Sequence, residues 1–311
     1  MKKIHIPNTD LDVSRIAMGC MRISDKSVDE VEELIRTALD EGINFFDHAD
    51  IYGKGKSETV FGEVLKRHPE WRSKMIIQSK CGIVQANATT RRSFNSSREY
   101  ILDSVTKILN RLNTDYLDIL LIHRIDALAD PKEIAETFDE LQAKGLVHYF
   151  GVSNYTPSSM ELLKKYMHQP LVVDQLQLSI VHSLIIDSEY FSDMRGDDAI
   201  VRDTGLLDYC RLNDISIQAW SPLQASWEEG SFIDHPGYPK LNAMLQEIAD
   251  KYHVTKSAVA TAWILRHPAQ IMAVAGTANP EHLREMCRAD GFELTRQEWY
   301  DIYMAEEKPL P

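Results

Sequence analysis

The sequence predicts a (β/α)8 barrel, the TIM-barrel fold, from two observations. Short apolar segments alternate with amphipathic segments along all 311 residues, which is the pattern of strands alternating with helices. The short segments are also largely apolar throughout, as expected for parallel strands covered on both faces. The eight expected strands, the number that this barrel requires, cover residues 16–21, 43–49, 75–81, 117–123, 147–153, 172–178, 215–220 and 271–276.

The segments between these strands carry the end signals of helices. Ser27-Val28-Asp29-Glu30 has the form of a capping box, an apolar stripe follows it, and Gly42 stands at the expected exit. Residues 98–112 repeat the amphipathic pattern. A cap residue also precedes a proline at the first helical position three times, in Asp130-Pro131, Thr156-Pro157 and Asn279-Pro280.

The chain is expected to form one domain over residues 1–311. Its length would allow two domains, but no shift in composition and no linker rich in Pro, Gly or Ser divides it. A doubly wound open sheet is the alternative architecture. Such a sheet would place its binding site in the crevice where the strand order reverses. Polar residues instead end nearly every expected strand here, so the barrel is favoured.

Composition narrows the class of protein. The formal net charge of -13 argues against a general nucleic-acid or anionic-membrane surface, although it leaves room for a phosphorylated cofactor at a local positive site. The N-terminal segment, residues 1–6, is too short and too polar for a signal peptide, and no run of about 18 apolar residues occurs. The cysteines lack CxxC spacing and are expected to be free thiols in a cytoplasmic protein: Cys20, Cys81, Cys210 and Cys287.

Four polar residues near the ends of three expected strands predict an active site. Asp47, Lys80 and His123 each close an apolar run, and Tyr52 follows Asp47 by five residues. Since active sites of such barrels lie at the carboxyl ends of the strands, these side chains are expected to meet. A lysine ammonium would lower the phenol pKa from about 10, and a carboxylate would hold the ammonium in place. The set suits protonation of a carbonyl oxygen as a hydride reaches the attached carbon.

Each of these residues also has a structural interpretation. Asp47 could cap the following turn, and Lys80 could be a surface charge at a strand end. His123 could be a core residue whose hydrogen bonds are made by its neighbours. Their occurrence together, on consecutive strand ends, favours the functional interpretation.

The sequence resembles the aldo-keto reductase family. The segment from Asp47 to Gly53, Asp-His-Ala-Asp-Ile-Tyr-Gly, looks like the DxADxYG segment of that family, and Lys80 lies in its strand-three position. His123-Arg124 follows Leu-Asp-Ile-Leu-Leu-Ile, and Gly151-Val152-Ser153-Asn154 matches the GVSN segment. The likeness runs from the N-terminal hairpin to residues 276–283 and therefore covers nearly the whole chain.

The resemblance implies a barrel that reduces carbonyl compounds with NAD(P)H. Tyr52 would be the general acid, and Asp47, Lys80 and His123 would complete the catalytic tetrad. The N-terminal hairpin, which contains Asp10, would plug the bottom of the barrel without a chemical role.

The resemblance also implies the cofactor contacts. Ser153, Asn154 and Gln175 would bind the nicotinamide carboxamide, and Trp220 would stack against the ring. The remaining contacts would run from the pyrophosphate to the adenosine end: Ser221, Leu223, Gly276, Thr277, His282 and Glu285.

The adenosine end departs from the pattern of family members that demand NADPH. Those members usually place a lysine or arginine in the stretch that begins at Gly276 and another six residues later, whereas Thr277 and His282 stand here. Arg284 is the nearest residue in the sequence whose side chain is always positively charged. NADP(H) is the favoured cofactor and NAD(H) remains possible.

Other signals are weaker. Gly55-Lys56-Ser57 resembles the tail of a phosphate-binding loop, but the required first glycine is replaced by Asp50, so a turn leading to a helix capped by Ser57 is expected. No GxGxxG precedes a helix, and the histidines form no metal-binding motif, so no metal site is expected. Long irregular segments at 181–202 and 224–240 are candidate lids, and the loop 83–96 could line the substrate mouth.

The leading functional hypothesis is reversible reduction of an aldehyde or ketone. The alternatives are Schiff-base chemistry on Lys80 and a cofactor-sensing regulatory subunit. The expected partner is a small carbonyl compound, with no nucleic acid and no membrane. The sequence specifies neither that compound nor the oligomeric state.

Overall fold

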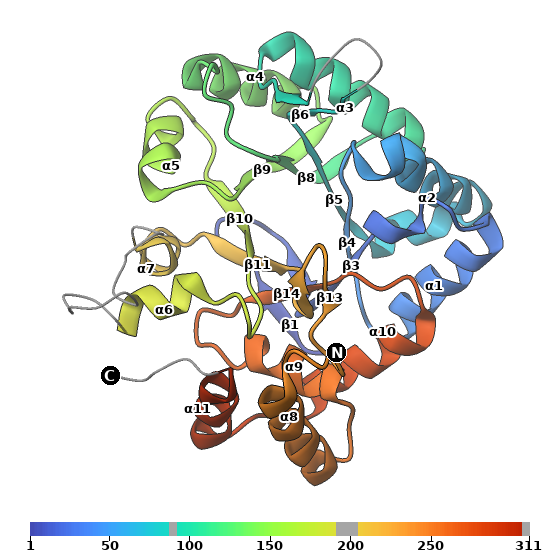
Figure 1. Cartoon of the computed structure of the whole chain (residues 1–311). Coiled ribbons are helices and arrows are strands. Elements are labelled where there is room, and N and C mark those ends of the chain that lie inside the picture. The colour runs from blue at the N-terminus through green and yellow to red at the C-terminus, as the bar shows by residue number, and fades with distance from the viewer. Residues whose placement is uncertain (87–91, 191–204, 307–311) are drawn as a thin grey trace.

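The computed structural model describes residues 1–86, 92–190 and 205–306 (Figure 1). All eight predicted strands form, and they close into a parallel barrel in chain order. The last strand pairs with the first, so the open-sheet alternative is wrong. The barrel strands are β3 (Ile16–Gly19), β4 (Phe45–Asp47), β5 (Ile76–Cys81), β8 (Leu117–Ile122), β9 (Val147–Ser153), β10 (Leu171–Gln177), β11 (Ser216–Trp220) and β14 (Met272–Ala275).

Helices surround the barrel, as Figure 1 shows. They are α1 (Val28–Asp40), α2 (Lys56–Arg67), α3 (Arg98–Leu112), α4 (Pro131–Ala143), α5 (Pro157–Lys164), α6 (Leu184–Tyr190), α7 (Leu206–Leu212), α8 (Pro239–Tyr252), α9 (Lys256–Leu265), α10 (Pro280–Cys287) and α11 (Arg296–Ala305). Within the three described ranges, no helix combines the length and apolar character needed to cross a membrane.

Most of the predicted helix ends are confirmed. Ser27 and Glu30 form the reciprocal capping box of α1, and α3 spans the predicted residues 98–112. The predicted cap at Ser57 is wrong. Helix α2 begins at Lys56, after Gly55 in a left-handed conformation with φ of 87°, so Ser57 already lies inside the helix. Its buried hydroxyl instead donates to the carbonyl oxygen of Met21.

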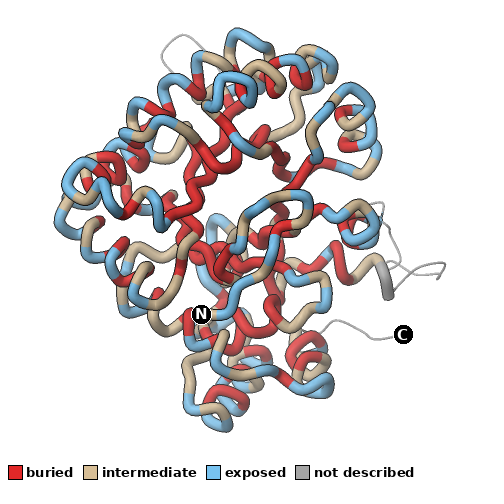
Figure 2. Tube along the Cα trace, turned by 180° about the vertical axis from the view of Figure 1, so that it is seen from behind, coloured by how far each residue is buried: buried red, intermediate tan, exposed pale blue. Residues whose placement is uncertain are grey.

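The core has two layers. The larger lies between the barrel wall and the helices, where Phe138 of α4 stacks on Phe150 of β9 with ring centroids 4.2 Å apart. The smaller fills the barrel interior and includes Phe45, Ile119 and Val172. The buried strands form the centre of the fold and the exposed residues its periphery (Figure 2).

The N-terminal hairpin closes one end of the barrel, as predicted. Its strands are β1 (Lys3–His5) and β2 (Asp12–Ser14). Ile6 and Val13 are fully buried against the interior layer of the barrel. The Tyr149 hydroxyl of β9 donates to Asp10 at 2.7 Å and ties the hairpin turn to the wall.

The segments expected to be irregular contain short elements. Helix α6 occupies the start of 181–202, so that expectation is wrong there, and residues 191–204 lie outside the described residues. Strands β12 (Gln224–Ser226) and β13 (Gly230–Ser231) pair within 224–240. In the loop 83–96, strands β6 (Ile83–Val84) and β7 (Ser93–Phe94) pair on either side of the undescribed residues 87–91.

Candidate active site

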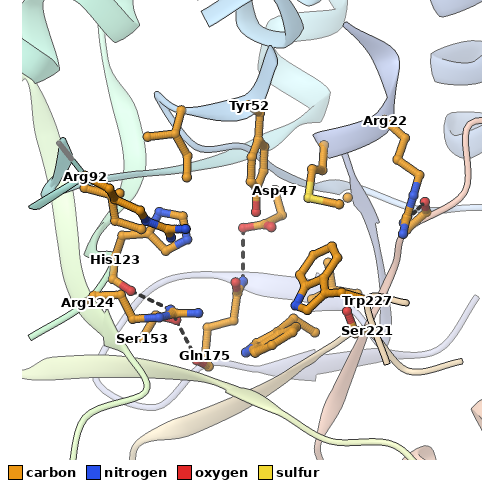
Figure 3. Close-up of a pocket in the computed structure, with 17 residues that line it drawn as sticks. Arg22, Asp47, Tyr52, Arg92, His123, Arg124, Ser153, Gln175, Ser221 and Trp227 are labelled. Carbon is orange, nitrogen blue, oxygen red and sulfur yellow. Dashed lines mark hydrogen bonds between the residues drawn. The ribbon is translucent and has the colours of Figure 1, made fainter. Parts of the chain in front are cut away.

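The barrel mouth gathers the four residues that the strand-end pattern singled out. Asp47 is the last residue of β4, Lys80 lies near the end of β5, and His123 directly follows β8. Beyond Asp47 the chain stays attached to β5, because the Asp50 amide donates to the Lys80 carbonyl oxygen at 3.0 Å. A 3-10 turn then begins at Tyr52 and directs that side chain back over the mouth (Figure 3).

A buried ion pair lies at the centre of the site. The Lys80 ammonium is fully buried and donates to both oxygens of Asp47 at 2.8 Å. It also donates to the carbonyl oxygen of His48 at 2.7 Å and to the Tyr52 hydroxyl at 3.2 Å. A buried charge is stable only when it is paired and hydrogen-bonded, and here every contact of the ammonium meets an oxygen.

The pKa values of Lys80 and Tyr52 follow from this arrangement. Burial alone would lower the Lys80 pKa, but the adjoining Asp47 and Tyr52 raise it above its usual value, so the side chain stays protonated. Burial also raises the pKa of Tyr52, and this effect outweighs the lowering by Lys80. Lys80 thus lowers the phenol pKa, as predicted, but it does not bring that pKa below its usual value. Lys80 therefore offsets only part of the rise in the Tyr52 pKa that desolvation causes.

His123 faces the phenol as a neutral ring. Burial, together with the positive charges of Lys80, Arg124 and Arg92, lowers the pKa of His123 well below 6.5. Its ring stands edge-on to Tyr52, with centroids 6.3 Å apart. The buried Nδ1 has no hydrogen-bond partner in the described part of the chain. A neutral imidazole carries one N–H, so donation from Nε2 requires the tautomer that has its proton on that nitrogen.

These groups border a cavity of about 500 Å³. Asp47, Tyr52 and His123 line it, whereas Lys80 lies behind them. Ser153, Gln175 and Trp220 line the same cavity, and so do two arginines at its outer side, Arg92 and Arg124. Figure 3 shows Arg92, His123 and Arg124 gathered on one side of this cavity, with Arg22 on the other.

Two of the three residues expected at the nicotinamide carboxamide, Ser153 and Gln175, line the first cavity. Ser153 is buried and donates to the backbone oxygen of Gln175 at 2.8 Å. Asn154 is exposed and is not part of the cavity lining. Its side-chain oxygen accepts a hydrogen bond from Trp220 Nε1 at 3.1 Å, so in this structure it holds the indole rather than facing the cavity.

A second cavity of about 470 Å³ continues from the first. Three residues line both cavities, namely Arg22, Ser221 and Gly276. The second cavity contains every residue that was expected from the pyrophosphate to the adenosine end: Ser221, Leu223, Gly276, Thr277, His282 and Glu285.

Arg22 is a residue of this site that the sequence analysis missed. Its Nη1 donates to the carbonyl oxygen of Gly276 at 2.7 Å, across the boundary between the two cavities. A Cβ atom at position 276 would lie 2.7 Å from the same nitrogen, so glycine allows this close approach. Arg22 lies just beyond the end of β3, so the strand-end criterion could have identified it.

Arg284 points away from the second cavity. Its guanidinium donates to Glu281 at 2.9 Å and to Thr37 of α1 at 3.4 Å. In the part of the second cavity that was expected to hold the adenosine end, the lining includes His282 and the acidic Glu285.

The lining residues fit a nicotinamide dinucleotide. Two joined cavities of similar volume match its two halves, and the Arg22 guanidinium lies where they meet, which suits a pyrophosphate. Helix α10, capped by Asn279, begins beside the second cavity. Among the described residues, no cluster of His, Cys, Asp and Glu side chains is arranged to hold a metal ion.

Comparison with known proteins shows the family. The model of the aldo/keto reductase family matches residues 15–307, so the chain belongs to the aldo-keto reductases. It is 34% identical over 315 residues to oxidoreductase YdhF of Escherichia coli strain K12, covering 98% of this chain and 97% of that protein. It is 35% identical over 300 residues to a 6-dehydroglucose reductase of Agrobacterium fabrum, covering 94% of each.

A solved structure agrees in fold. The thermostable aldo-keto reductase Tm1743, crystallised with the inhibitor epalrestat, superposes with a TM-score of 0.78 at 26% identity. The match covers 98% of this chain and all of that one. The protein is therefore an oxidoreductase of a family that uses nicotinamide cofactors and acts on small carbonyl compounds.

Proposed function

We propose that this protein reduces an aldehyde or ketone to the alcohol with NAD(P)H, and that Tyr52 is the general acid. The observation that carries the proposal is the distance of 3.2 Å between Lys80 Nζ and the Tyr52 hydroxyl, beside a cavity that Tyr52 and His123 line. NAD(P)H, when bound, supplies the hydride. The residues of the chain then have to bind the carbonyl, orient it and protonate its oxygen.

Each member of the tetrad has a physical role in that step. Tyr52 holds its proton at neutral pH and can donate it, and Lys80 offsets part of the rise in its pKa that burial causes. Lys80 stabilises the phenolate left behind, and Asp47 keeps the ammonium charged and in position. The neutral His123 can donate a hydrogen bond to the same carbonyl oxygen and orient it toward the phenol.

We further propose NADP(H) as the favoured cofactor, with NAD(H) also accepted. The family resemblance favours NADP(H). The diversion of Arg284 to Glu281 and Thr37 supports weak discrimination between NADP(H) and NAD(H), since His282 is a poorer substitute for a guanidinium.

The proposal also includes one domain over residues 1–311, which is supported by the closure of all the barrel strands into one barrel. It includes a cytoplasmic location as well, which is supported by four free, buried cysteines.

Schiff-base chemistry on Lys80 is disfavoured by the site. Such chemistry needs a neutral, nucleophilic amine that can reach the substrate. The Lys80 ammonium is instead fully buried behind Asp47, and its pKa is raised. The site therefore suits a lysine that remains charged.

A panel of uncharged aldehydes, assayed by loss of NADPH absorbance, tests the proposal. Reduction of at least some of them is expected. Tight NADPH binding without reduction of any carbonyl would contradict the proposal and favour a cofactor-sensing subunit.

A further inference from the structure

The barrel interior directly beneath Asp47 contains three glutamines. Gln78 lies on β5, Gln175 on β10 and Gln218 on β11, and their exposed fractions are 0%, 3% and 0%. The sequence analysis assigned a role to Gln175 alone. Burying an amide costs free energy unless its hydrogen bonds are restored, so a group of buried amides in a mostly apolar interior needs an explanation.

The three amides form one hydrogen-bonded network with Asp47. Asp47 Oδ1 accepts from Gln78 Nε2 at 2.7 Å and from Gln175 Nε2 at 3.1 Å. Gln218 Oε1 accepts from the same two nitrogens, at 2.8 and 2.9 Å. Gln218 Nε2 donates to Gln78 Oε1 at 3.1 Å and closes the network.

The carboxylate fixes which way each amide points. Because an ionised carboxylate can only accept, the nitrogens of Gln78 and Gln175 must face Asp47. Gln78 then presents its oxygen to Gln218 Nε2, so Gln218 presents its own oxygen to Gln175. The Gln175 nitrogen therefore has two acceptors. No hydrogen bond from the described residues reaches the Gln175 oxygen, and Gln175 lines the first cavity, as Figure 3 shows.

We propose that Gln78 and Gln218 are positioning residues that hold the Gln175 amide with its oxygen toward the bound nicotinamide carboxamide. This inference rests on the proposed nicotinamide binding at Ser153 and Gln175. The fixed Gln175 oxygen accepts a hydrogen bond from the carboxamide NH2. When a methyl group replaces that NH2, the oxygen receives no hydrogen bond from the cofactor. The network thereby selects the carboxamide among pyridine cofactors.

Binding of two cofactors tests the inference without relying on turnover. The dissociation constants of NADP+ and of its 3-acetylpyridine analogue, in which a methyl ketone replaces the carboxamide, are measured by quenching of tryptophan fluorescence. The wild-type protein is expected to bind NADP+ roughly five- to tenfold more tightly, the range of one hydrogen bond to an acceptor otherwise left unpaired. Gln218→Met removes one of the two acceptors of Gln175 Nε2 and should reduce this preference severalfold. Gln78→Met should act in the same direction, because it frees Gln218 to turn.

Two further variants separate positioning from loss of structure. Gln218→Glu, protonated in this buried place, can still accept from Gln78 and Gln175 and donate to the Gln78 oxygen, so it should retain the wild-type preference. Thr137→Val removes a buried hydrogen bond in α4, far from the mouth, and should lower stability while leaving the preference unchanged. Thermal unfolding identifies which variants are folded.

The possible results are distinct. Equal binding of the two cofactors by the wild-type protein, or an unchanged preference in folded Gln218→Met and Gln78→Met, would overturn the inference while leaving the proposed reductase intact. Failure of the wild-type protein to bind either cofactor, and NAD+ as well, would overturn the proposed function itself.

Discussion

Replacing Lys80 by methionine tests how the site tunes its acid. Methionine fills a similar volume and removes the charge. The substitution leaves Asp47 Oδ1 with its amide donors Gln78 and Gln175 but takes away the countercharge of the carboxylate. Removing one partner of a buried ion pair costs about 3–5 kcal/mol. At an unfolding entropy of about 2.1 cal/mol/K per residue, that cost lowers Tm by about 5–8 °C for a chain of this length.

The effect on reduction can be worked from the distance between the two groups. A full negative charge on the Tyr52 oxygen, 3.2 Å from Lys80 Nζ, gains about 5 kcal/mol at an effective dielectric constant of about 20. A transition state with about half of that charge gains about 2.5 kcal/mol, which corresponds to a rate factor of roughly 70. Lys80→Met should therefore lower kcat for an uncharged aldehyde by about two orders of magnitude.

The assay compares kcat at a temperature where both proteins are folded. Lys164→Met is the matched control, because Lys164 also contacts an acid and a phenol, Glu161 and Tyr209, but outside the barrel mouth. It should leave kcat unchanged. If folded Lys80→Met also kept its kcat, the electrostatic role of the ammonium would be refuted.

Three further predictions concern pH, the cofactor and stability. Because burial raises the pKa of Tyr52 and lowers that of His123, kcat for reduction should stay level from about pH 6.5 to about pH 10. A rise or fall of kcat with pH inside that range would contradict the directions of these two pKa shifts. Arg22→Ala should weaken NADPH and NADH binding equally, by about tenfold or more, since a pyrophosphate is common to both; a change in their ratio, measured by fluorescence titration, would place Arg22 at the adenosine end instead. Burial raises the pKa of Asp174 to about 8 from 3.8, so the folded chain holds a proton that the unfolded chain releases, and stability is lost as pH rises between these values. Asp174→Asn should therefore stabilise the protein more at pH 8 than at pH 5 in urea unfolding, and an equal gain at both values would argue against a shifted carboxyl group.

The sequence predicted the barrel because local signals and tertiary burial agree along it. The strands are largely apolar since both faces are covered, and helices such as α1, where Ser27 and Glu30 form a capping box, carry their own caps. Where two local signals competed, the prediction was wrong. Ser57 is a good cap residue, but the left-handed Gly55 starts α2 earlier.

The site was predictable wherever position along a strand implied position in space. Asp47, Lys80 and His123 meet because parallel strands end at the same side of the barrel. Gln78 and Gln218 were missed because they lie inside strands, where a polar residue gives no periodic signal and its partners are distant in sequence. The direction of the Tyr52 pKa shift was also beyond the sequence, because it depends on how deeply the phenol is buried.

Replacing Tyr52 by phenylalanine tests the central claim most directly. The substitution removes the hydroxyl that contacts Lys80 and keeps the ring that lines the cavity. Reduction of an uncharged aldehyde and binding of NADPH are measured on the same preparation. Loss of most of the turnover with cofactor affinity retained is the predicted result. Turnover equal to that of the wild-type protein would contradict the assignment of Tyr52 as the acid.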